Sequence, residues 1–227
     1  MPLTLEKIVP WGRTYDEYVA MFSMSPEERS QKILGCGDGP ASFNSVLTKA
    51  GGSVVSVDPL YAFRPEQIQA RIDATSTIVL EQTQENRANF VWDTISSVAE
   101  LGRLRTLAMD AFLQDFRQGR KPGRYMAAEL PRLPFKDKSF DLALCSHLLF
   151  LYSEQLSETF HLDSIRELYR VANRIKIFPL LELNARKSRH LPWVVTQLKK
   201  EDLRVTVTRV AYEFQKGGNE MLEITAR

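Results

Sequence analysis

The stretch KILGCGDGPASFNSVLTKAGGSVVSVD, residues 32–58, decides the fold of this chain. A short apolar run ends abruptly in glycines, and residues 41–50 then have a helical pattern that stops at Gly51-Gly52. The run SVVSVD follows and ends in Asp58. Strand, glycine turn, helix, glycine stop and strand is the order of a βαβ unit, in which a helix connects two parallel strands. We therefore predict an α/β protein built on a parallel sheet.

The glycine turn has a spacing that bears on the kind of ligand. Glycines between a strand and a helix let backbone N–H groups approach a ligand with no Cβ in the way, although such turns also occur for structural reasons alone. The dinucleotide fingerprint GxGxxG would require glycine at position 40, where this chain has Pro40. The spacing therefore argues against a nicotinamide cofactor.

Asp58 is the second indication of a nucleoside site. It ends the strand that follows the turn, roughly 20 residues on, where a carboxylate can accept hydrogen bonds from both hydroxyls of a ribose. The alternative is an aspartate that caps a turn before Pro59. In combination with the glycine turn, the ligand interpretation is favoured.

Around this unit, the sequence indicates a helical preface at residues 1–31 and one domain over residues 32–227, with an all-helical insert at about 62–122. Three helical faces are expected in the insert, one of them from Val91 to Val98. The aromatic residues of the preface either form a lid over the site or belong to the core. These residues are Trp11, Tyr15, Tyr18 and Phe22.

The second half of the chain alternates between strand and helix patterns. A buried strand is expected to end near Pro179, and two alternating strands around Gly217-Gly218 predict a C-terminal antiparallel hairpin. The expected strands are 125–129, 141–146, 174–183, 203–214 and 221–227, and the expected helices are 156–172 and 191–200.

Residues 129–147, ELPRLPFKDKSFDLALCSH, carry a resemblance to a known family. The run LPFKDKSFDLALCSH resembles a segment of class I S-adenosylmethionine (SAM)-dependent methyltransferases, especially the broad type 11 group. The glycine turn resembles the first motif of that family and residues 57–59, VDP, its second. The resemblance implies a doubly wound, Rossmann-like, seven-stranded and mostly parallel sheet, with a C-terminal antiparallel hairpin whose last strand inserts between its neighbours.

The same resemblance implies a set of cofactor contacts. Asp58 would hold the ribose hydroxyls of SAM, Glu129 would contact the adenine amino group and Leu130 would flank the ring. The full set is Gly35, Cys36, Gly37, Asp38, Gly39, Asp58, Pro59, Glu129, Leu130 and Ser146. His147, one residue beyond the fourth strand, would face the methyl group.

The first motif departs from the family pattern at two positions. Its acidic residue is replaced by Gly35, with Asp38 nearby but shifted, and its last glycine aligns with Ala41. Whether Asp38 substitutes for the missing acid is open at this point. The departure keeps a SAM-binding sensor or partner protein without catalysis as an alternative.

Methyl transfer from a sulfonium is an in-line displacement that needs mainly orientation, and a base only if the acceptor must lose a proton. His147 is the candidate base, or else a histidine packed at the sheet edge. His161 and His190 are predicted on surface segments and are assigned no role. Tyr61 would pack either on the nucleoside or in the core.

Composition narrows the partners. With 30 basic and 28 acidic residues the net charge is +2, and no basic stripe indicates nucleic acid. Two cysteines outside any CxxC pair, and no signal or membrane-spanning pattern, favour a cytoplasmic protein without a metal site. We predict a small-molecule methyl acceptor and no membrane partner. The alternatives are a nicotinamide-dependent oxidoreductase and, through the basic run 117–124, a methylase of protein or RNA.

Overall fold

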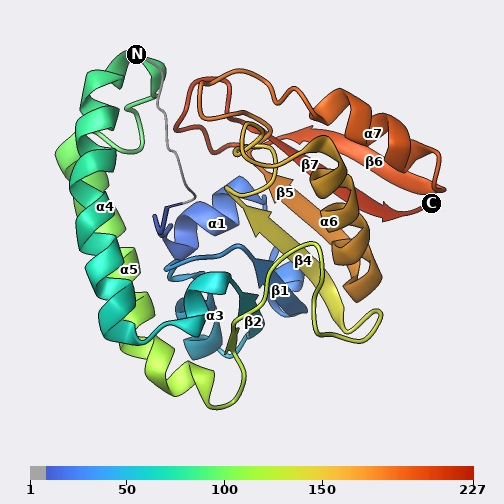
Figure 1. Cartoon of the computed structure of the whole chain (residues 1–227), viewed down its shortest axis with the longest axis horizontal. Coiled ribbons are helices and arrows are strands. Elements are labelled where there is room, and N and C mark those ends of the chain that lie inside the picture. Colours follow the sequence, from blue (N-terminus) through green and yellow to red (C-terminus); the bar gives the residue numbers. More distant parts are fainter. Residues whose placement is uncertain (1–8) are drawn as a thin grey trace.

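In the computed structural model, which describes residues 9–227, a mostly parallel sheet runs through the molecule in the order β3-β2-β1-β4-β5-β7-β6 (Figure 1). The first five strands of that order are parallel, and β7 is antiparallel to both β5 and β6. The last strand of the chain is therefore inserted between its neighbours, as the resemblance implied. The strands are β1 Lys32–Cys36, β2 Ser53–Val57, β3 Tyr125–Met126, β4 Phe140–Ser146, β5 Ala172–Phe178, β6 Leu203–Arg209 and β7 Glu220–Ala226.

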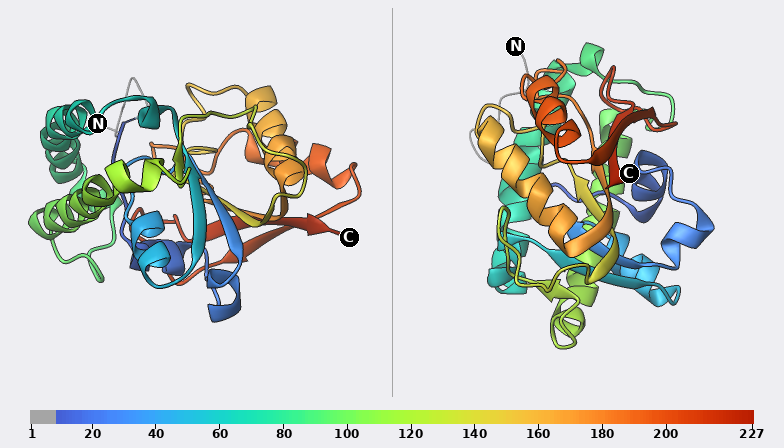
Figure 2. Two further views of the ribbon diagram at one scale, coloured as in Figure 1. Left: turned by 90° about the horizontal axis from the view of Figure 1, so that it is seen from below. Right: turned by 90° about the vertical axis from the view of Figure 1, so that its right-hand side faces the viewer.

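Helices cover both faces of the sheet (Figure 2). Apolar side chains of α6 and α7 pack on one face, and those of α1 and α3 pack on the other. The α-helices are α1 Tyr15–Met21, α2 Pro26–Arg29, α3 Phe43–Lys49, α4 Pro65–Glu85, α5 Val98–Arg120, α6 Glu158–Val171 and α7 Leu191–Lys199, and the 3₁₀ helices are η1 Pro59–Ala62 and η2 Arg87–Asn89. This is the doubly wound α/β arrangement predicted from the sequence.

The helices begin where their capping residues require. Thr14 and Glu17 form a reciprocal capping box at α1, and Ser25 and Glu28 form one at α2. Ser157 caps α6 by accepting from the backbone N–H of Phe160. These local signals fix the residues at which the three helices begin.

The segment between β2 and β3 forms two long helices, α4 and α5, that stand together beyond the β3 edge of the sheet (Figure 1). Aromatic side chains of α5 pack with η1 and β3 in a separate cluster. The helical face expected from Val91 to Val98 is wrong, because residues 90–97 are not helical and Ser97 caps α5 at Val98. That stretch instead pairs with the loop after β6, where Val91 N–H donates to the carbonyl of Phe214 at 2.7 Å.

The topology decides where a ligand can bind. In the sheet, β2 lies on one side of β1 and β4 lies on the other. The chain connections after β1 and after β4 therefore run in opposite directions, and they separate at the carboxyl ends of these two strands. Ligands of open α/β sheets bind in the crevice at such a switch point. Within residues 9–227, no helix combines the length and the apolar character needed to cross a bilayer.

Candidate functional site

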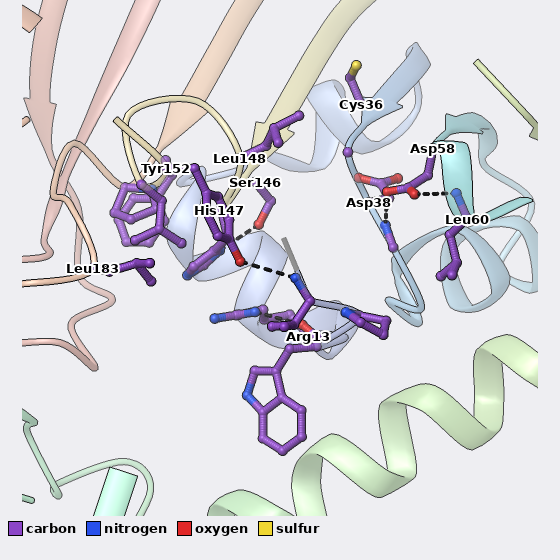
Figure 3. Close-up of a pocket in the computed structure, with 18 of the residues that line it drawn as sticks. Arg13, Cys36, Asp38, Asp58, Leu60, Ser146, His147, Leu148, Tyr152 and Leu183 are labelled. Carbon is purple, nitrogen blue, oxygen red and sulfur yellow. Dashed lines mark hydrogen bonds between the residues drawn. The ribbon is translucent and has the colours of Figure 1, made fainter. Parts of the chain in front are cut away.

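A cavity of about 420 Å³ opens at this switch point. Its size lies within the range of ordinary small-ligand sites. Figure 3 shows Asp38 and Asp58 at one end of it and Tyr152 and Leu183 at the other, with His147 between them. The two ends differ in chemistry and are described in turn.

The glycine turn after β1 forms the floor of the first end. Gly37 and Gly39 have φ of +68° and +52°, the left-handed region that favours glycine. A Cβ on Gly37 would lie 2.7 Å from the side chain of Leu148, so the turn has no room for a side chain there. Both glycines line the cavity, and their backbone can approach a bound ligand closely.

The side chain of Asp38 occupies the space that a side chain at position 35 would need. A Cβ built on Gly35 would lie 1.8 Å from Oδ2 of Asp38, so the carboxyl group fills the place where a side chain of residue 35 would begin. Tyr18 donates its hydroxyl to Asp38 Oδ1 at 2.9 Å, and Ser56 donates to Oδ2 at 2.6 Å. Residue 35 can therefore be glycine only while the carboxyl group of Asp38 takes this place.

The carboxyl of Asp38 is 6% exposed, and its burial raises its pKa to about 6 against the opposing hydrogen bonds from Ser56 and Tyr18. The charge of Asp58 adds to the increase. The group is therefore ionised near neutral pH but close to its titration range. Gly35 itself does not line the cavity, since Asp38 lies in front of it.

Asp58 lies beside the turn at the end of β2. Its Oδ2 accepts from the backbone N–H of Gly39 at 2.9 Å and its Oδ1 from that of Leu60 at 2.8 Å, so it does cap the turn that follows (Figure 3). Burial raises its pKa, and these two N–H donors oppose the increase. Each carboxylate oxygen has a second lone-pair direction, which leaves both oxygens able to accept a ribose hydroxyl as well.

Ser146 and His147 come at the end of β4. Ser146 Oγ lies 2.8 Å from Nδ1 of His147, and the backbone N–H of His147 donates to the carbonyl of Phe178 at 2.7 Å. His147 has φ of +54°, which turns its side chain into the cavity. Burial, followed by the charges of Arg13 and Arg105, holds its pKa well below the usual range, so the imidazole is uncharged at neutral pH.

The far end of the cavity combines aromatic walls with arginine. Arg105, from α5, is 1% exposed and forms two hydrogen bonds with Glu17, at 2.5 and 2.7 Å. Tyr212 donates to the same carboxylate at 2.8 Å. Burial raises the pKa of Glu17, but the charge and hydrogen bonds of Arg105 outweigh that effect and lower it to about 2. The pair is ionised at all ordinary pH values.

Three chain segments close this end. The stretch from Val9 to Arg13 crosses it, and Gly12 packs so closely on Pro40 that a Cβ would lie 2.1 Å from the carbonyl oxygen of Pro40. The rings of Phe90 in the insert and Phe214 in the loop after β6 pack at a tilt of 31° with centroids 4.9 Å apart, and both residues line the cavity. The insert thus supplies part of the wall.

Comparison with known proteins places this arrangement in a family. No protein-family model matches the chain. Uncharacterized protein MJ0045 of Methanocaldococcus jannaschii is 33% identical over 223 residues, which cover 98% of each chain. The chain belongs to the family of MJ0045.

Two solved structures are similar to this chain at low sequence identity. Magnesium protoporphyrin IX methyltransferase (ChlM) from Synechocystis PCC 6803 with bound SAM has a TM-score of 0.49 at 13% identity, over 94% of this chain and 78% of that one. A SAM-dependent methyltransferase from Aquifex aeolicus has a TM-score of 0.44 at 15% identity, over 92% and 87% of the two chains. The mostly parallel, seven-stranded sheet, with its last strand inserted between its neighbours, agrees with what the resemblance to class I methyltransferases implied.

Nearly all of the site residues predicted for this member of the MJ0045 family face the same cavity. Gly35 is the exception, for the reason given above. Leu130 is buried, and Glu129 lies exposed where the cavity opens. The residues that line it are Cys36, Gly37, Asp38, Gly39, Asp58, Pro59, Glu129, Leu130, Ser146 and His147. Their roles toward a cofactor stay predictions.

Two open alternatives are resolved by burial. Tyr61 is 1% exposed among Phe112, Phe116 and Tyr125, and its hydroxyl donates to the carbonyl of Gly39 at 2.7 Å, so it is a core residue that supports the turn. In the preface, Trp11 and Tyr18 line the cavity. Tyr15 stacks on Phe43 and Phe22 lies in the core, so the preface serves both purposes.

The prediction that His161 lies on a surface segment is wrong. The residue is fully buried, and its Nε2 accepts from the backbone N–H of Phe150 at 2.9 Å while Nδ1 lies 2.7 Å from the carbonyl of Ser157. Burial lowers its pKa to about 4. His190 is partly buried against it, with ring centroids 5.1 Å apart. His161 fixes the loop that follows His147.

Sequence reasoning missed the charged residues of the far end. Arg105 falls four residues after Leu101 and three before Ala108, both buried, so it stands on the apolar face of α5. A lone arginine on such a face was a usable signal. Its partner Glu17 is 88 residues away, and no local pattern connects the two.

Proposed function

We propose that this protein is a SAM-dependent methyltransferase that acts on a small molecule in the cytoplasm. The observation that carries the proposal is the cavity itself, which places the glycine turn and Asp58 at one end and Ser146 and His147 at its middle. If the nucleoside of SAM occupied the first end, Ser146 and His147 would lie between the cofactor and the far end of the cavity. The two buried free cysteines suit a reducing compartment.

The residues fit SAM at the first end. Gly37 and Gly39 leave room for close approach, Asp58 has acceptor capacity for two hydroxyls, and Leu130 offers an apolar wall for a purine. Glu129 is positioned to accept from an exocyclic amine at the opening. SAM would supply an activated methyl group with a good leaving group.

The chain's own contribution is then to orient and to exclude water. The walls formed by the preface, the insert and the loop after β6 enclose the acceptor end. His147 is uncharged near neutral pH, so one of its ring nitrogens can accept a proton or a hydrogen bond from the acceptor. Ser146 beside Nδ1 fixes the ring.

Calorimetric titration with SAM, with S-adenosylhomocysteine (SAH) and with NADH tests the proposal. We expect micromolar binding of SAM and SAH and none of NADH. Asp58→Ala should weaken both by roughly 100-fold or more, because it removes two hydrogen bonds to a charged group at about 1.5–3 kcal/mol each. His147→Ala should leave SAH affinity within a few fold, since its predicted contact is with the acceptor.

Asp58→Asn is the matched variant, because it keeps the shape and one acceptor oxygen while removing the charge. Its affinity should lie between those of the wild type and Asp58→Ala. NADH binding in preference to SAM would refute the methyltransferase assignment. Binding of SAM without methyl transfer to any acceptor in a broad screen would favour the non-catalytic sensor.

A further inference from the structure

We propose that the methyl acceptor is a small, largely apolar or aromatic molecule that carries an anionic group, and that Arg13 binds this group. The inference rests on the proposed function and names the substrate class of the same cavity. Its starting point is a charge imbalance at the far end, between two guanidinium groups and one carboxylate.

The carboxylate of Glu17 is fully committed. Its two oxygens accept from Arg105, from Tyr212 and from the backbone N–H of Thr14. This pair is balanced in charge and occupies both carboxylate oxygens, although Nε of Arg105 is also buried without an acceptor within residues 9–227. Arg13, which lines the same cavity, adds a second positive charge with no carboxylate of its own in the described part of the chain.

Arg13 also has unused donors. Its Nη1 donates to the carbonyl of Trp11 at 2.7 Å, while its Nε is buried and has no acceptor within residues 9–227. A buried guanidinium donor without a partner is costly, and an anion that accepts from it recovers that cost. Burial and the neighbouring charge of Arg105 lower the pKa of Arg13, and the smaller opposing effects of Tyr212 and Glu17 do not cancel them.

The location of Arg13 separates it from the carboxylates of the cavity. Figure 3 shows its side chain extending below His147 and Tyr152, away from Asp38 and Asp58. Those two carboxylates already accept hydrogen bonds from Tyr18, Ser56 and backbone amides. Of the other two arginines that line the cavity, Arg105 is paired with Glu17, and Arg71 is exposed and lies over the ring of Phe63. Arg13 is therefore the cation that we expect an acceptor beside the uncharged His147 to meet.

The surrounding walls define the rest of the acceptor. They are apolar, and several are aromatic rings suited to stacking with a flat ligand. Polar groups at this end are few, among them the hydroxyls of Tyr152 and Tyr212. The apolar walls are formed by Trp11, Leu148, Leu151, Phe160, Phe178 and Phe214.

Matched acids and amides test this inference. Phenylacetate and indole-3-acetate would be titrated into the SAH-loaded protein beside phenylacetamide and indole-3-acetamide, which have nearly the same shape without the charge. We expect each acid to bind at least about tenfold more tightly than its amide, the value of one charge-assisted hydrogen bond. Arg13→Met should reduce that ratio to about one.

Arg103→Met is the control, because Arg103 is an exposed arginine of the same helix as Arg105 and pairs with Glu100 outside the cavity. It should keep the wild-type ratio. The unfolding midpoint of each variant shows whether it is folded, and Arg13→Lys, which keeps the charge, should retain part of the preference.

A second source of carboxylate is the methionine part of the cofactor. SAH has this group and 5′-methylthioadenosine lacks it, so we expect Arg13→Met to change the affinity of both by less than about threefold. A selective loss of SAH affinity in Arg13→Met would place the cofactor's carboxylate on Arg13 and overturn the acceptor inference. Equal binding of acids and amides by the wild type would overturn it too. Failure of the wild type to bind SAM or SAH would instead refute the proposed function.

Discussion

Mutation can test whether positions 35 and 38 share one site for a carboxylate. Gly35→Asp alone places a Cβ 1.8 Å from Asp38 Oδ2, so the Asp38 carboxylate must leave its place. It would lose the hydrogen bonds from Tyr18 and Ser56, at 2.9 and 2.6 Å. At about 1.5–3 kcal/mol for each bond to a charged group, we expect Gly35→Asp to reduce the free energy of unfolding by roughly 3–6 kcal/mol.

Asp38→Ala alone removes the carboxylate and leaves the hydroxyls of Tyr18 and Ser56 without their acceptor. Each unpaired buried hydroxyl costs about 1–3 kcal/mol, partly offset because a carboxylate with a raised pKa is also removed. The double variant Gly35→Asp/Asp38→Ala returns one carboxylate to the same space from the other backbone position. We expect it to be more stable than the sum of the single effects predicts, by at least about 2 kcal/mol.

Urea unfolding of the four proteins gives the double-mutant cycle, and SAH titration of each shows whether cofactor affinity follows. Gly35→Ala serves as the control, because it introduces the steric conflict with Asp38 without adding a carboxylate. Adding Asp38→Ala to this variant should relieve the clash but should not restore the hydrogen bonds of Tyr18 and Ser56. Additive free energies in the Gly35→Asp/Asp38→Ala cycle would refute the idea that the two positions share one site for the acid.

Two further variants probe the buried charges. Asp38→Asn removes a group whose pKa is raised to about 6 in the folded protein. The wild type should therefore lose roughly 3 kcal/mol of stability as the pH rises from about 3 to about 7, and the variant should not lose it. Equal pH profiles in urea unfolding would contradict this. Arg105→Met leaves Glu17 buried without its counter-charge and should cost about 3–5 kcal/mol, while Arg105→Met/Glu17→Gln should recover much of the loss in thermal unfolding.

The sequence was sufficient for the sheet because its signals are local. Glycines after one strand, an aspartate at the end of the next and the alternation around Gly217-Gly218 each act within a few residues. They predicted β1, β2 and the antiparallel pair of β6 and β7, all present. The strand predicted at 174–183 is present as β5, but it ends at Phe178 instead of Leu183, because Pro179 cannot continue the ladder.

What the sequence did not show depends on distance in space. The overlap of Gly35 and Asp38 follows from how the turn folds back, and residue spacing alone does not contain it. His161 was misplaced, although it lies four residues before Ile165 on the buried face of α6, because its polarity was given more weight than its position. Residues 90–97 had a helical spacing, but pairing with the loop after β6 overrides it.

The buried charges at the two ends of the cavity are costly for the fold, and that cost indicates where ligands belong. Asp38 is kept ionised near neutral pH although burial raises its pKa, and Arg13 is kept with a buried donor that has no acceptor within residues 9–227. Apolar residues of similar size would make a more stable empty cavity at either place. The Asp38 carboxylate lies toward the end proposed for a cationic cofactor, and the Arg13 guanidinium lies toward the end proposed for an anionic acceptor. Together they would orient both molecules with their reactive atoms near His147. Stabilisation of Arg13→Met relative to the wild type, with loss of acid binding, is therefore the combined result that this argument requires.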